Sequence, residues 1–84
     1  MDIRDLAPPE VRGSAPRLTL TGREEVLIEG HRGLISYETE NIRVRSGMGL
    51  ISVSGKHLTI AYFGTQDLLI LGRVQDVSIS EEGG

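Results

Sequence analysis

The pattern that most limits how this chain can fold is a strict alternation of apolar and polar residues in short segments. Ile42 and Val44, for example, alternate with Arg43 and Arg45. Side chains on a β-strand point to opposite faces in turn, so this spacing is typical of a strand with one buried face. The same pattern recurs in four further pairs: Leu18 and Leu20, Ile51 and Val53, Leu58 and Ile60, and Val77 and Ile79.

Glycines separate these segments, for example Gly22, Gly47, Gly55 and Gly72. Glycine supplies the positive φ that tight turns need, and connections this short cannot hold a crossover helix. The sequence therefore predicts an all-β domain of about eight short antiparallel strands in a meander, forming a small sandwich or an open barrel. A β-solenoid is the alternative, because an apolar-x-apolar-x-Gly unit recurs at irregular intervals.

Two segments interrupt the alternation with consecutive apolar residues, at 26–28 and 68–71. On a strand, such runs place apolar side chains on both faces. These strands are therefore expected either to lie between two layers, or to leave one apolar face exposed for a partner.

The 84 residues allow one domain. Pro8, Pro9 and Pro16 predict a flexible leader over residues 1–16, followed by a β domain over 17–80 and a disordered acidic, glycine-containing tail over 81–84. Neither a signal peptide nor a membrane-spanning run is apparent, so we expect a soluble protein without direct membrane insertion.

The composition argues against catalysis and against nucleic-acid binding. Cysteine is absent, and His31 and His57 each lie in a predicted turn without a second donor at a metal-ligand spacing. No catalytic, metal or cofactor residues are therefore predicted, and the protein is not expected to be an enzyme. A net charge of −3 and only three aromatic residues also disfavour binding to phosphates or stacking on bases.

The residues that best fit a protein interface are the exposed arginines of one strand and a pair of aromatic residues on another. Arg43 and Arg45 share the outward face of their strand. Tyr62 and Phe63 are consecutive, so they face opposite sides; either one of them points outward as an anchor or both are buried between two layers. With two residues of the glycine-rich turn, the predicted interface comprises His31, Arg32, Arg43, Arg45, Tyr62 and Phe63.

Several ordered segments resemble the YabP/YqfC family of sporulation proteins, and the YqfC branch more closely. They are the run Leu27-Ile28-Glu29-Gly30-His31-Arg32-Gly33-Leu34-Ile35-Ser36-Tyr37, the segments Ile42-Arg43-Val44 and Gly49-Leu50-Ile51-Ser52-Val53-Ser54-Gly55, and the closing Leu69-Ile70-Leu71-Gly72-Arg73-Val74. Gly30 occupies a turn position where the family pattern has Asn.

The resemblance implies a role in spore development in the mother cell of a spore-forming bacterium. It also implies a membrane-embedded sporulation protein as a companion, which would hold this cytoplasmic chain peripherally at the membrane around the forespore. Family members have no active-site residues to carry over. We therefore expect a non-enzymatic scaffold or adaptor that self-associates and docks on that protein. A small ligand- or carbohydrate-binding module of the spore envelope is the alternative.

Overall fold

The computed structural model describes residues 15–81 and shows six strands within that range. They are β1 (Arg17–Thr21), β2 (Glu25–Glu29), β3 (His31–Glu38), β4 (Asn41–Ser46), β5 (Gly49–Phe63) and β6 (Asp67–Ser80). All pair antiparallel in one open sheet, in the order β1-β2-β6-β5-β4-β3. The all-β prediction is confirmed. The β-solenoid alternative is wrong, because its strands would run parallel.

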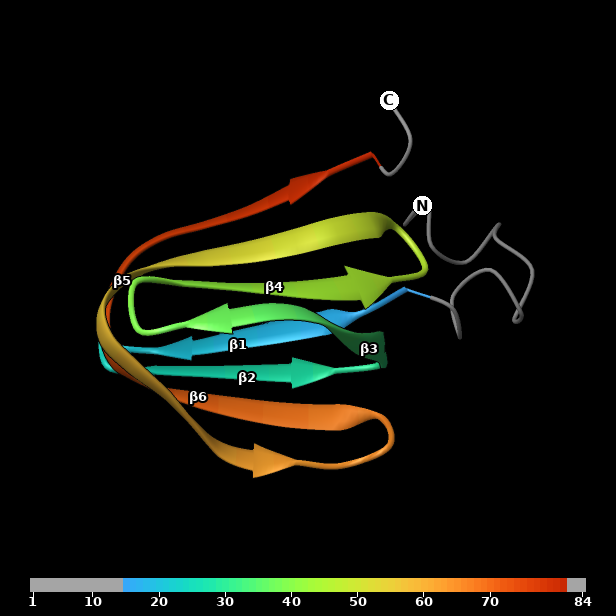
Figure 1. Ribbon diagram of the computed structural model, residues 1–84. Helices are drawn as coiled ribbons and strands as arrows, with labels where there is room; N and C mark the ends of the chain where they lie inside the picture. Colours follow the sequence, from blue (N-terminus) through green and yellow to red (C-terminus); the bar gives the residue numbers. More distant parts are fainter. Residues whose placement is uncertain (1–14, 82–84) are drawn as a thin grey trace, which may run out of the picture.

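The number of strands differs from the prediction because β5 and β6 are unusually long, with 15 and 14 residues. Each was expected as two short strands, but both bend sharply and continue without a turn (Figure 1). The sheet therefore folds over on itself into two facing layers. The upper layer in Figure 1 contains β3, β4, residues 49–55 of β5 and residues 74–80 of β6. The lower layer contains β1, β2, residues 58–63 of β5 and residues 67–71 of β6.

Glycines make the bend possible by allowing the two long strands to approach closely. A Cβ at Gly55 would collide with the carbonyl oxygen of Arg73 and lie 3.1 Å from the Cα of Val74. Gly72 has a φ of 140°, and a Cβ there would lie 2.5 Å from the carbonyl oxygen of His57. Only glycine fits both positions without a shift of the backbone. These two glycines were predicted to lie in turns, whereas they lie inside strands.

Two hairpin turns fasten the bends through backbone hydrogen bonds. In the turn between β3 and β4, the carbonyl oxygens of Glu40 and Thr39 accept from the N–H groups of Gly55 (3.0 Å) and Leu58 (2.8 Å). In the turn between β1 and β2, the carbonyl oxygens of Glu24 and Arg23 accept from Gly72 (3.1 Å) and Val74 (2.7 Å) in the same way. Backbone N–H groups at the bends that have no partner on a neighbouring strand are thereby hydrogen-bonded.

The core lies between the two layers and consists of β-branched and leucine side chains that face inward by register. Ten of them are buried: Val26, Ile28, Ile42, Val44, Ile51, Val53, Leu58, Leu68, Ile70 and Val74. Burial of one such side chain contributes about 1.5–3 kcal/mol to folding. The core is aliphatic, and every aromatic side chain of the protein lies at its margin or outside it.

The first described strand begins at Arg17 and the last ends at Ser80. Most of the predicted leader and tail, residues 1–14 and 82–84, lies outside the described residues. No helix within residues 15–81 is long and apolar enough to cross a bilayer.

Candidate protein-interaction surfaces

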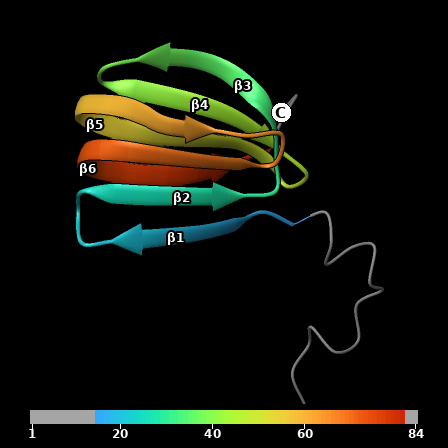
Figure 2. The same ribbon diagram turned by 90° about the horizontal axis from the view of Figure 1, so that it is seen from below.

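The outer face of the lower layer carries an apolar surface that nothing in the described structure covers. Register places Leu27 of β2 beside Leu69 of β6, which in turn lies beside Tyr62 of β5. Leu71 lies on the same face, one step along β6. Leu27 and Leu69 are half-buried, and Tyr62 and Leu71 are exposed. We call these four residues the leucine face; Figure 2 looks toward the layer that carries it.

This surface shows which side chains of the apolar runs at 26–28 and 68–71 are left outside the core. In both runs the even-numbered members, such as Ile28 and Ile70, are buried in the core, while Leu27, Leu69 and Leu71 point outward. Within residues 15–81, these strands are therefore covered on one side only. The second expectation, an apolar face left exposed, is the one that the structure confirms.

Charged residues surround the leucine face, and two carboxylates meet at one end of it. On the same outer face, register places Glu29 between Arg17 and Asp67, and Glu25 between Thr21 and Leu71. At the other end, Glu25 and Leu71 line a hollow together with Arg23 and Arg73. Glu29 and Asp67 are directly opposite each other on neighbouring strands, a like-charge arrangement that disfavours the isolated sheet.

The outer face of the upper layer is mostly polar, although Leu50 also lies on it. Arg43 and Arg45 both point outward there, as the alternation predicted. In register with Arg43 lie Ser52 of β5 and Ser78 of β6. The amide Nδ2 of Asn41 donates to the hydroxyl oxygens of Ser52 (3.0 Å) and Ser54 (2.9 Å). The two layers therefore present different chemistry outward: arginine and serine on one side, leucine and carboxylate on the other.

His31 lies at the margin of the core, 5% exposed, rather than in an exposed turn. Its Nδ1 accepts from the backbone N–H of Gly33 (3.1 Å), so its proton is on Nε2, which donates to the carbonyl oxygen of Gly64 (2.9 Å). Its ring packs against that of Phe63, with centroids 5.2 Å apart. Solvent reaches little of this side chain.

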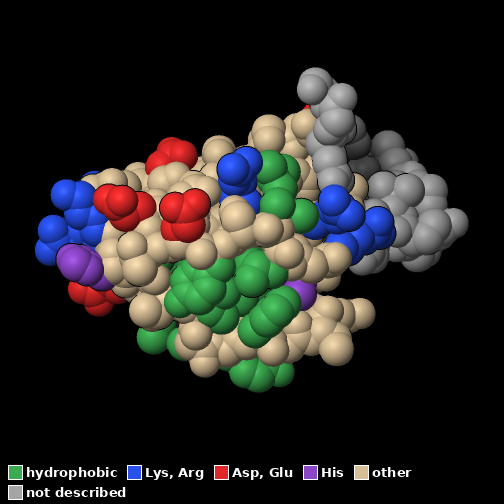
Figure 3. Space-filling model, in the orientation of Figure 1, with side chains coloured by type: hydrophobic (Ala, Val, Ile, Leu, Met, Phe, Trp, Pro, Cys, Tyr) green, Lys and Arg blue, Asp and Glu red, His purple; other side chains and the backbone are tan. Residues whose placement is uncertain are grey.

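These contacts join β3 to the free edge of β5, a region that we call the β3–β5 seam. Here the hydroxyl of Tyr37 accepts a hydrogen bond from the backbone N–H of Ile60 at 3.1 Å. The seam thus closes one side of the sandwich with side chains instead of a strand ladder. Figure 3 looks onto this side and shows apolar side chains gathered beside a histidine.

The six predicted interface residues are therefore spread over different surfaces. Tyr62 is 57% exposed on the leucine face, whereas Phe63 is 52% exposed at the seam, so neither is buried and the alternative that buried both is wrong. Arg43 and Arg45 lie on the upper layer, and Arg32 is exposed near the start of β3. Among them, the rings of His31 and Phe63 are in contact.

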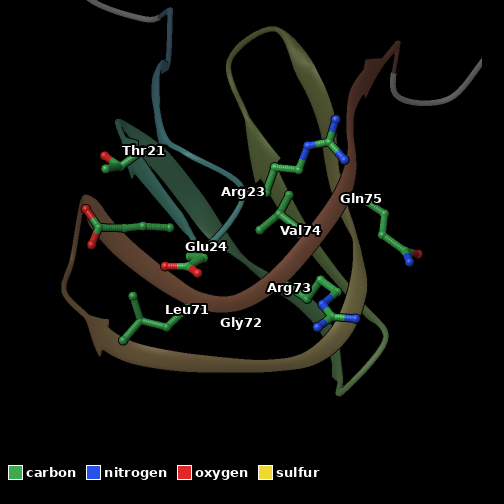
Figure 4. A pocket seen from close by; sticks show the side chains of 9 residues that line it. Thr21, Arg23, Glu24, Leu71, Gly72, Arg73, Val74 and Gln75 are labelled. Atoms are coloured by element: carbon green, nitrogen blue, oxygen red, sulfur yellow. The ribbon is translucent and has the colours of Figure 1, made fainter.

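A hollow of about 800 Å³ lies where β6 bends beside the turn between β1 and β2. Arg23, Glu24 and Arg73 line it, and Figure 4 shows their charged groups spread around the rim rather than gathered at one point. Within residues 15–81 no group of three or more histidines and carboxylates is close enough to hold a metal ion. The hollow therefore lacks the convergent polar groups of a ligand site.

Comparison with known proteins places the chain in a family. Residues 13–84 match the model of the YabP family. The chain is also 32% identical over 74 residues to the uncharacterized protein YqfC of Bacillus subtilis (strain 168), a match that covers 88% of this chain and 80% of that protein. The match to the family model covers the whole described sheet, including the leucine face and the β3–β5 seam. This chain is a member of the YabP family.

Proposed function

We propose that this protein is a non-enzymatic adaptor of sporulation, which docks on a membrane-embedded partner around the forespore and associates with further copies of itself. The observation that carries the proposal is the leucine face. Leu71 and Tyr62 are exposed on a regular sheet whose inner face is already occupied by a complete core. An exposed apolar surface on a small domain marks an interaction site, because it gains free energy only when another surface covers it.

The β-sheet edges support the self-association part of the proposal. Residues 74–80 of β6 pair with β5 on one side, and none of the other described strands pairs with them on the second side. Within this segment the register to β5 shows no bulge from Asp76 to Ser80, and Asp76 is its one charged residue. Edge strands without bulges, prolines or lysines accept further strands readily.

Membership of the YabP family supports the assignment to spore development. We expect the protein to accumulate in sporulating cells of its host and to be nearly absent from growing cells. Fractionation of the sporulating cells should then recover it with the membranes, from which high salt or alkaline carbonate releases it without detergent. Equal amounts in growing cells would contradict the sporulation role. Recovery wholly in the soluble fraction would contradict docking on a membrane protein.

A further inference from the structure

We propose that the leucine face binds a protein segment whose apolar residues are flanked by lysine and arginine. The inference rests on the proposed adaptor function. It adds which surface of this chain binds the partner and what chemistry the bound segment has. It starts from the combination already described: four apolar side chains on the outer face of the lower layer, and the carboxylates of Glu29 and Asp67 opposite each other at one end of that face. Aliphatic and aromatic anchors within a charged rim are the usual composition of a docking site.

The charge pattern decides which kind of partner fits. Glu29 and Asp67 lie opposite each other, and Arg17 flanks Glu29 on one side only. A cation placed between these two carboxylates would relieve their repulsion, whereas an anionic surface would add to it. This pair of carboxylates, the acidic rim of the leucine face, therefore disfavours anionic lipid headgroups and favours a basic polypeptide. Basic flanks are also what the cytoplasmic ends of membrane proteins carry, in agreement with the partner under Proposed function.

The same pattern disfavours a second copy of this chain as the occupant. Two leucine faces packed about a twofold axis along the strands would place Glu29 opposite Asp67 of the other copy. An axis across the strands would instead place Glu29 opposite Glu25 of the other copy. Either arrangement brings like charges together at an interface. Self-association therefore belongs to another surface, and the leucine face is left for a different protein.

Photocrosslinking in sporulating host cells tests the assignment with a matched pair of positions. Tyr62 and Phe63 are neighbouring aromatic residues, 57% and 52% exposed, and they lie on different surfaces. Replacement of either by the photoreactive residue p-benzoylphenylalanine keeps an aromatic ring in place. We expect irradiation to yield a crosslinked protein from position 62 and not from position 63, with the crosslink in a segment rich in lysine and arginine.

Variants of the full chain then separate the surface from the function. Leu69→Ser changes the leucine face, and Asp67→Lys changes the acidic residues beside it. Leu50→Ser and Asp76→Lys make the same chemical changes on the outer face of the upper layer. We expect the first two to lower the yield of the crosslink about tenfold or more. Loss of an interface anchor weakens binding by about 1.4 kcal/mol or more, and about 1.4 kcal/mol corresponds to a factor of ten in affinity. The second two should leave the yield unchanged. Urea unfolding of each variant confirms that the fold is retained.

Several outcomes would overturn the inference. If wild-type protein is recovered with the membranes but Leu69→Ser and Asp67→Lys are recovered equally well, the surface is wrong and the adaptor function stands. A crosslink from position 62 to a second copy, or to an acidic segment, refutes the proposed partner chemistry. Equal binding of the protein to protein-free vesicles of phosphatidylglycerol shows that lipid is the ligand instead. Absence of wild-type protein from the membranes would refute both the adaptor function and the partner proposed for the leucine face.

Discussion

Removal of the His31 side chain should open the β3–β5 seam and destabilise the whole domain. His31→Ala deletes the hydrogen bonds to Gly64 and Gly33 and the ring contact with Phe63. Each hydrogen bond contributes about 0.5–1.5 kcal/mol, and an aromatic pair adds about as much. The free energy of unfolding should therefore fall by about 2–4 kcal/mol, a large part of the roughly 5–10 kcal/mol available to a domain of this size.

Urea unfolding followed by circular dichroism measures this loss. With a slope near 1 kcal/mol per molar urea for a small domain, the midpoint should fall by about 2 M or more. His57→Asn is the control, because His57 is exposed and makes none of these contacts. In a double-mutant cycle, Phe63→Ala should show a coupling of about 0.5–1.5 kcal/mol with His31→Ala. An unfolding free energy of His31→Ala within 0.5 kcal/mol of wild type, as for a neutral surface substitution, would refute the account of the seam.

Three further predictions test the bends and the edge. Gly55→Ala should lower the unfolding free energy by about 1–3 kcal/mol through its clash with Arg73, whereas Gly64→Ala meets only the movable ring of Tyr62 and should cost less; equal losses in urea unfolding would contradict the packing of the bend. His57 has a φ of 56°, so His57→Val should cost about 1–2 kcal/mol and His57→Asn almost nothing, and a tolerated valine would argue against that backbone conformation. Ile79→Lys, in the segment of β6 that has one unpaired edge, should reduce the mass measured by light scattering in a dilution series to that of one chain; an oligomer that persists would place self-association elsewhere.

Local patterns in the sequence were sufficient to predict the strands but not how they are connected. Alternation identified both halves of β5 and the second half of β6, because inward-facing residues such as Ile51 and Leu58 recur with the period of a strand, and a continuous apolar run identified the first half of β6. Glycine marks a turn and a tight approach of two backbones equally well, so Gly55 and Gly72 could not be distinguished from turn residues. What distinguishes them is contact with a distant strand, which a local pattern does not contain.

The same limit applies to the candidate surfaces. His31 was predicted to contribute to an interface, yet it is buried because Gly64, far along the chain, comes to lie beside it. The apolar runs left two possibilities open, a strand between two layers or an exposed apolar face, and the described residues show the second. The acidic rim was missed, since Glu29 and Asp67 become neighbours only through the pairing of β2 with β6. The signal available in the sequence was an apolar residue at the outward position of a strand. The charged residues around it can be identified only from the register between neighbouring strands.

The central claim, that the leucine face docks the protein on its partner, is tested most directly by quantifying how much of each variant is recovered with the membranes of sporulating cells. Wild type, Leu69→Ser and Leu50→Ser are compared at equal expression. The account predicts that wild type and Leu50→Ser are recovered with the membranes while Leu69→Ser becomes soluble, because only Leu69 lies on the leucine face. Equal recovery of Leu69→Ser and wild type would contradict it.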